Sequence, residues 1–199
     1  MSQKISFQII DGFESDQKAQ VARLFWDAFK QKLSFALKPE EKAFEFLELV
    51  IDADHAISAV NFNGDVIGVA GFKTDMGAFV GGGGQELCQV YGAFGGIWRA
   101  GVLLLLDRSK EKMTLLMDGL FVSDKARGLG VGSALLNAIK KEASKRGCSR
   151  VRLDVIDSNP RARALYEREG FVAEDTSDFG PLRYFFGFQE VTTMFYEVE

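Results

Sequence analysis

Apolar residues recur every three or four positions in two stretches near the start of the chain, a spacing typical of helices with one buried face. A helix over residues 15–33 is predicted by six such positions: Val21, Leu24, Phe25, Ala28, Phe29 and Leu33. Pro39 suits the first position of a second helix, and the glutamates that follow it complement the positive end of a helix dipole. A strand over residues 4–10 precedes both helices.

Alternation with a period of two replaces this spacing around Asn63-Gly64. Two β-rich runs, AISAVNF and DVIGVAGFK, flank that dipeptide, which is typical of the tight turn of a hairpin. The next segment, residues 75–112, follows neither period. It contains glycines at 81–84 and then Tyr91, Phe94 and Trp98 among further glycines. We interpret it as a loop that leads into an apolar helix over residues 90–107.

Strands and helices alternate in the last part of the chain. The predicted elements are a strand over 113–122, a helix over 130–146, a strand over 151–156, a short helix over 161–169, and strands over 171–178 and 188–198. The mixed order, without a linker, predicts one domain over residues 1–199 in the α+β (mixed α/β) class.

Composition and charge narrow the classes of function. The chain is 47% hydrophobic and 26% charged, as in an ordinary soluble globular protein, and its net charge of -4 gives no reason to expect nucleic acid as a partner. A single histidine and two distant cysteines exclude most zinc chemistry. The N-terminus lacks the apolar core of a signal peptide, and the run GVLLLL is far shorter than a membrane span of ~20 residues. We therefore expect a cytoplasmic protein with no membrane partner and no metal.

Three glycines at alternate positions, Gly128, Gly130 and Gly132, lie where the strand over 113–122 leads into the next helix. Glycine costs backbone entropy and supplies no packing, so its repetition here indicates that something approaches the main chain closely. The free amides of a first helical turn and the peptide dipoles both favour a negative charge at this place. A phosphate or pyrophosphate is the expected ligand.

Three interpretations fit this loop. A dinucleotide-binding fold would use Gly128, Gly130 and Ser133 as an approximate G-x-G-x-x-G/A signature, with Asp154 farther along the chain. That signature normally opens a domain, whereas about 120 residues precede it here and the remainder is too short for a second nucleotide-binding half. The second interpretation is a glycine turn without a ligand, and the third is a site for coenzyme A.

Two motifs favour coenzyme A. LFVSDKARGLGVGSALL fits an R/Q-x-x-G-x-G/A signature at Arg127, Gly130 and Gly132, and NPRARALYEREGF at 159–171 matches an Asn-x-x-A-x-x-L-Tyr-Glu-x-x-Gly-Phe ending. With both motifs, residues 113–172 resemble the GNAT superfamily of acyl-CoA-dependent N-acyltransferases. The resemblance implies a GNAT-like fold, in which a central, mostly antiparallel sheet of about seven strands contains a splayed parallel pair and carries helices on both faces. Residues 113–172 would be the acyl-CoA-binding core and residues 75–112 an insertion.

The resemblance also implies how acetyl-CoA would be held as cosubstrate. The strand that carries Leu120, Phe121 and Val122 would splay from its parallel neighbour, and the pantetheine arm would pair with the exposed backbone in the gap. Asn159 and Tyr166 match cofactor-contacting positions. The pyrophosphate would bind main-chain amides of seven residues: Arg127, Gly128, Leu129, Gly130, Val131, Gly132 and Ser133.

Tyr166 matches the position proposed to protonate the departing thiolate. A phenol with a pKa of about 10 can donate to a thiolate with a pKa of about 8.5 against only a small gradient. The alternative is a packed aromatic residue whose hydroxyl has no catalytic role.

Asp118 is the candidate for accepting the proton of the attacking amine. Alternation along TLLMDGLFV places it on one face with Leu116, Leu120 and Val122, where an isolated carboxylate among apolar neighbours should have a raised pKa. Related proteins often carry an acid on this strand. The alternatives are an anchor for the substrate ammonium and a side chain that points into solvent. A strand amide near Leu120 would meet the oxyanion.

The expected function is an N-acetyltransferase that transfers an acetyl group from acetyl-CoA to a primary amine by direct attack in a ternary complex. The alternative is a non-catalytic acyl-CoA-binding or sensor module of the same fold. The acceptor would be a small molecule or a protein amino group, and a homodimer is compatible with the resemblance. Tyr91, Phe94 and Trp98 would shape the acceptor pocket, unless the 75–112 segment packs on the sheet or forms a dimer surface.

Overall fold

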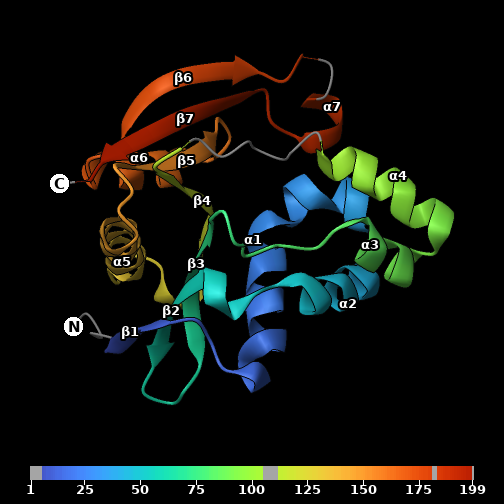
Figure 1. Ribbon diagram of the computed structural model, residues 1–199, viewed down its shortest axis with the longest axis horizontal. Helices are drawn as coiled ribbons and strands as arrows, with labels where there is room; N and C mark the ends of the chain where they lie inside the picture. The colour runs from blue at the N-terminus through green and yellow to red at the C-terminus, as the bar shows by residue number, and fades with distance from the viewer. Residues whose placement is uncertain (1–5, 105–111, 181–182, 199) are drawn as a thin grey trace.

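The computed structural model describes residues 6–104, 112–180 and 183–198, and its centre is a twisted seven-stranded sheet (Figure 1). The strand order is β1-β2-β3-β4-β5-β7-β6. Only β4 and β5 run parallel, and the other neighbours pair antiparallel. The strands are β1 (Phe7–Asp11), β2 (Ala56–Asn61), β3 (Val66–Lys73), β4 (Thr114–Val122), β5 (Arg150–Ile156), β6 (Val172–Asp178) and β7 (Glu190–Glu197).

Helices cover both faces of this sheet. The helices are α1 (Lys18–Leu37), α2 (Glu40–Val50), α3 (Gly84–Tyr91), α4 (Ala93–Leu104), α5 (Val131–Lys145), α6 (Pro160–Arg168) and α7 (Arg183–Phe186). Three short 3-10 turns are η1 (Ser15–Gln17), η2 (Ala53–His55) and η3 (Asp124–Ala126). Across the described parts of the chain, the helices all fall short of the length and apolarity that crossing a membrane would need.

The helices α1, α2 and α3 and the helix α5 lie on opposite faces of the sheet (Figure 1), and each face has a large hydrophobic core. On one face, α1, α2 and α3 bury side chains such as Trp26, Phe46 and Leu87. On the other face, α5 buries its apolar stripe, which includes Leu135 and Ile139. The predicted class, the mostly antiparallel sheet with one splayed parallel pair, and the helices on both faces are thereby confirmed.

The predicted elements match the observed ones closely where the periodicity is strong. The hairpin forms as β2 and β3, and the helix that follows the glycine loop forms as α5. The first helix is longer at its carboxyl end than predicted, and Pro39 lies immediately before α2 as its N-cap rather than inside it. Residues 4–5 of the predicted first strand and the 105–107 end of the predicted apolar helix lie outside the described residues.

The glycine- and aromatic-rich segment forms two helices instead of the single predicted one. α3 ends at Tyr91 and α4 begins at Ala93, and Gly92 between them has a φ of 76°. A left-handed glycine ends a helix, because that conformation breaks the repeating hydrogen bonds and only glycine adopts it without strain. α7, inside the aromatic stretch near residue 185, was not anticipated from the sequence.

Candidate active site

β4 and β5 are hydrogen-bonded at one end only. Thr114 pairs with Arg150 and Leu116 with Arg152, and beyond these residues the two strands continue without pairing to each other. A cleft of about 280 Å³ opens there, lined by both strands and by α6. Unpaired strand edges present N–H and C=O groups with which an extended ligand can pair. The fold therefore provides a strand-like binding edge inside the sheet.

A β-bulge in β4 gives a physical reason for this separation. Gly119 pairs with Gly71 on β3, whereas Met117 pairs with Phe72, so Asp118 is the residue that the bulge inserts into β4. A bulge bends its strand and increases the local twist. Leu116 is the last residue of β4 that pairs with β5, and the bulge begins just after it. The bulge therefore turns β4 away from β5 at the point where their pairing ends.

The bulge also corrects the predicted position of Asp118. Met117, before the bulge, and Leu120 and Val122, after it, all pack in the core on the α5 side, so simple alternation does not continue through the strand. Asp118 is exposed and does not share a buried apolar face with those residues. The premise of an isolated carboxylate among apolar neighbours is therefore wrong. Asp118 lines the β4–β5 cleft and, at the same time, a second and larger cavity.

The glycine loop lies at the amino end of α5. Gly128 and Gly130 have φ values of 79° and 84°, and Gly130 is the N-cap residue of the helix. A β carbon at either position would meet no atom within 4 Å, so the backbone conformation, rather than crowding, requires glycine there. At Gly132 the reason is packing, because a β carbon would lie 3.0 Å from Leu165 Cδ2 on α6.

The amides of this loop are divided between internal bonds and the first helical turn. The N–H groups of Arg127 and Leu129 donate to the carbonyls of Asp124 and Ala126, at 3.4 Å each. The first N–H groups of a helix have no partner within it, so those that begin at Val131 are directed outward. Within the stretch 127–133, the amides that could meet a predicted anion are therefore those at the start of α5, since the Arg127 and Leu129 amides already donate within the loop.

Asn159 and Tyr166, both from the second sequence motif, line the β4–β5 cleft. Asn159 is the N-cap residue of α6, and its Oδ1 accepts a hydrogen bond of 3.1 Å from the Ala162 amide. Tyr166 is 6% exposed and its ring packs against Phe171. Burial raises the pKa of Tyr166 well above its ordinary value of 10.0, so its phenol is protonated throughout the physiological range. Tyr166 is therefore a residue of the cleft wall whose hydroxyl group is protonated.

A larger cavity of about 720 Å³ adjoins this cleft. Its wall is built by α1, α2, α3, α4 and the segment after β3. Phe29, Lys32 and Asp118 line both spaces and mark the junction between them. Phe29 comes close to the strand because Gly119 has no side chain, since a β carbon there would lie 2.8 Å from the phenyl ring. The junction therefore joins the cleft between β4 and β5 to the larger cavity.

The three aromatic residues predicted to shape an acceptor pocket do not line this cavity. The Tyr91 hydroxyl donates to the Leu37 carbonyl at 2.5 Å, Trp98 packs against Phe35 with 5.5 Å between ring centroids, and Phe94 is 94% exposed. The 75–112 segment contributes other residues instead. These are Met76 to Ala78, Val80 to Gly84, Leu87, Ala100, Leu103 and Leu104, together with Asp75.

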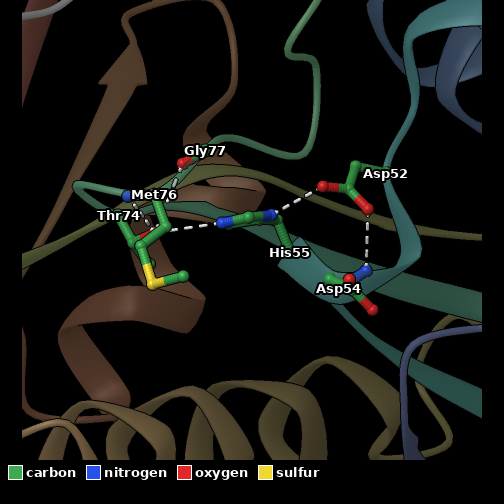
Figure 2. A network of polar contacts seen from close by, with 6 residues as sticks. All are labelled: Asp52, Asp54, His55, Thr74, Met76 and Gly77. Atoms are coloured by element: carbon green, nitrogen blue, oxygen red, sulfur yellow. Dashed lines mark hydrogen bonds and ion pairs between the residues drawn. The ribbon is translucent and has the colours of Figure 1, made fainter.

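A network of polar contacts around the buried His55 supports the segment after β3, which lines the cavity; Figure 2 shows the network. His55 Nδ1 donates to Asp52 Oδ2 at 2.8 Å, and His55 Nε2 lies 3.0 Å from the Thr74 hydroxyl. Thr74 Oγ1 also accepts from the Met76 amide at 3.1 Å. A β carbon at Gly77 would lie 2.6 Å from the His55 ring, so this loop passes directly over the imidazole. His55 is thus a structural support for the segment after β3.

Sequence reasoning missed the cavity residues of α1 and α2. Phe25, Phe29 and Leu33 have the spacing of a helix face that packs on a sheet, and nothing in that spacing distinguishes a filled core from a cavity wall. The glycine run 81–84 was the one feature of the sequence that could have indicated a cavity, because glycines form a wall without side chains.

The chain matches known sequences. A family model described as "Acetyltransferase (GNAT) family" matches residues 18–171. Among curated proteins, the thialysine N-epsilon-acetyltransferase of Bos taurus is 36% identical over 62 residues, which are 31% of this chain and 35% of that protein. The match thus spans about a third of the length of that relative.

Solved structures share the whole fold at low identity. A putative acetyltransferase from Acinetobacter baylyi ADP1 has a TM-score of 0.66 at 16% identity, over 99% of this chain and 94% of that one. An N-acetyltransferase from Staphylococcus aureus Mu50 has a TM-score of 0.66 at 13% identity, over 95% and 100%. A GCN5-related N-acetyltransferase from Kribbella flavida has a TM-score of 0.64 at 18% identity, over 96% and 97%. These similarities establish the shared fold.

Proposed function

Because the chain belongs to the GNAT acetyltransferase family, we propose that it transfers the acetyl group of acetyl-CoA to a primary amine by direct attack in a ternary complex. The observation that carries the proposal is the junction of two spaces at Asp118. One space is a cleft with an unpaired strand edge and Tyr166 on its wall, and the other is large enough for an acceptor.

Acetyl-CoA fits the first space in three respects. The pantetheine amides would pair with the free edge of β4 at Leu120, Phe121 and Val122, in place of the missing strand neighbour. The diphosphate would lie at the start of α5, where outward amides and the helix dipole favour an anion. Asn159 would contribute its side-chain amide, whose oxygen already caps α6. The proposal requires no metal.

The chemistry needs two proton transfers and no covalent enzyme intermediate. The neutral amine nitrogen attacks the thioester carbonyl carbon, and the oxyanion that forms accepts a hydrogen bond from a β4 amide near Leu120. The C–S bond then breaks and the thiolate leaves with a proton or hydrogen bond from Tyr166. Asp118 accepts the proton of the amine, directly or through water. The raised pKa of Tyr166 makes it a weaker acid than an exposed phenol but keeps it fully protonated for this step.

Calorimetry and a thiol-release assay test the proposal together. Binding of acetyl-CoA, followed by thiol release with at least one amine above the rate of hydrolysis, is the expected result. Binding of acetyl-CoA with no thiol release for any amine would instead identify a non-catalytic acyl-CoA-binding module. No heat with either CoA or acetyl-CoA would overturn the assignment of the cleft.

A further inference from the structure

The larger cavity indicates which amines this protein accepts. We infer that the acceptor is a primary amine attached to a bulky apolar body, aliphatic or aromatic, rather than a polyamine or an aminoglycoside. This inference rests on the proposed function and names the substrate class of the same site. A cavity of about 720 Å³ is within the range of ~300–1,000 Å³ that holds a drug-sized ligand.

The lining of the cavity is mostly apolar. Phenylalanine side chains from α1 and α2 and leucine side chains from α1 to α4 contribute to its wall, and the glycines of the 81–84 run add backbone surface. The apolar lining residues are Phe25, Phe29, Leu33, Leu37, Phe46, Leu47, Met76, Ala78, Val80, Leu87, Ala100, Leu103 and Leu104. A hydroxyl or ammonium group placed against such a wall loses its water without gaining a partner, which is unfavourable.

Charge in the cavity gives no advantage to a polycation. Among the described lining residues, Lys32 and Lys73 balance Asp75 and Asp118, so the formal charges of the wall cancel. Each of these four residues already has an interaction within the protein. Of the two aspartates, only Asp118 also lines the β4–β5 cleft, where acetyl-CoA is proposed to bind. One amino group therefore has a carboxylate next to the thioester, whereas further amino groups would find, in the described lining, only Asp75, whose charge the two lysines offset, among mostly apolar walls.

The glycines on the α3 side enlarge the cavity instead of serving close packing. A β carbon at Gly84 would have only Ala100 Cβ near it, at 4.0 Å, and one at Gly83 would have only Glu86 Oε2, at 3.7 Å. Both distances are ordinary contacts, so packing would tolerate a side chain at either position. Gly82 differs, because a β carbon there would lie 2.0 Å from Val50 Cγ1. With the amine at Asp118, the apolar body would extend toward Leu87, Ala100 and Gly84.

A homologous series of primary amines tests the inference. Thiol release from acetyl-CoA is measured with propylamine, butylamine, hexylamine and octylamine, and with spermidine, kanamycin and a short peptide as polar acceptors. We expect kcat/KM to rise by about fourfold per methylene until the body fills the cavity, since each methylene leaves water for an apolar wall. Spermidine and kanamycin should react at least tenfold more slowly than hexylamine. A flat series, or a preference for any of the polar acceptors, would overturn the inference.

Leucine substitutions at two helical glycines test where the apolar body of the amine lies in the cavity. Gly84→Leu places a side chain toward Ala100 inside the cavity, whereas a β carbon at Gly101 on α4 meets no atom within 4 Å and Gly101 is absent from the described lining. Gly84→Leu should lower the octylamine-to-butylamine ratio of kcat/KM by about tenfold or more. Gly101→Leu should leave this ratio unchanged. Equal ratios in both variants would contradict the assigned position of the apolar body.

Failure of this inference is distinguishable from failure of the proposed function. If the protein binds acetyl-CoA and acetylates spermidine or the peptide in preference to alkylamines, the acetyltransferase proposal stands and the apolar acceptor is wrong. If acetyl-CoA binds but no acceptor reacts, displacement of a fluorescent apolar probe by octylamine reports the cavity directly. Absence of displacement would then overturn the inference, and displacement would support the cavity as an apolar amine site in a protein without turnover.

Discussion

The imidazole of His55 and the hydroxyl of Thr74 lie 3.0 Å apart, although they belong to segments on either side of the β2–β3 hairpin (Figure 2). His55 is 7% exposed, and Thr74 lines the larger cavity. Asp52 accepts a hydrogen bond from the other ring nitrogen, so the ring connects η2 to the loop that follows β3. The cavity wall thus depends on a buried side chain that does not line the cavity itself.

Removal of the Thr74 hydroxyl should destabilise the fold. Thr74→Val keeps the shape of the side chain but leaves His55 Nε2 and the Met76 amide without their partner, which typically costs about 1–3 kcal/mol. Urea unfolding measures this loss, and Thr74→Ser should recover most of it. Equal stability of Thr74→Val and the natural chain would show that the network does not support the loop.

Acid should weaken the same network through Asp52. Partial burial raises the pKa of this carboxyl, but hydrogen bonds from His55 and the Asp54 amide, with the nearby charges of His55 and Lys18, hold the pKa below its ordinary value of 3.8. Because this pKa is lower in the folded state, the ionised Asp52 carboxylate contributes its full share of the folding stability above pH 3.8. This contribution disappears as the pH falls through the folded-state pKa. The stability difference between the natural chain and Asp52→Asn, measured by urea unfolding, should therefore shrink below pH 3.8. A difference that grows with acid would contradict this sign.

Gly130 and Gly147 allow backbone strain to be separated from cofactor binding. They lie at the two ends of α5 with φ values of 84° and 68°, and a β carbon at either meets no atom within 4 Å. Alanine at each should cost roughly 1–2 kcal/mol in unfolding free energy, because the left-handed conformation strains it. Only Gly130→Ala should also weaken acetyl-CoA binding in calorimetry, by tenfold or more, since only that end of α5 is the proposed diphosphate site. Equal affinities in both variants would argue against the loop as the anion site.

Tyr166→Phe should reduce kcat by tenfold or more while the fold remains intact. The phenyl ring keeps its packing against Phe171, and general acid catalysis is worth about 10²–10⁴ in rate. Tyr184, which is 78% exposed, provides the matched control as Tyr184→Phe. Because burial raises the pKa of Tyr166 above 10.0, its ionisation should cause no decline of kcat up to that pH. An unchanged kcat in Tyr166→Phe would assign this residue to packing alone.

Asp118→Asn separates the roles proposed for this carboxylate. If Asp118 accepts the amine proton, the variant should lose at least tenfold in kcat, and the rise of kcat with pH should change shape. If it anchors the ammonium, KM for the amine should increase and kcat should change little. Asp27→Asn is the control, on a residue whose ion pair with Lys30 lies on the surface of α1. Unchanged kcat and KM for the amine would exclude both roles.

Local patterns sufficed for most elements of this fold. The apolar stripe of α5, the Asn63-Gly64 turn and the strand–glycine–helix order each depend on neighbours a few residues apart, and the conformational preferences of such neighbours are short-range. For the same reason the glycine loop could be assigned to the start of a helix from its residues alone. The motif around Asn159 and Tyr166 could likewise be placed on α6.

The tertiary structure alone decided where Asp118 lies and how large the cavity beside it is. A bulge depends on how β4 registers against β3, a pairing between residues far apart in the sequence, so alternation within β4 could not reveal it. The cavity depends on whether faces from four helices meet completely, and the spacing within each helix is the same for a filled and an open interface. The sequence by itself determined most of the elements and the family motifs, whereas long-range packing determined the shape of the cavity that we propose holds the acceptor.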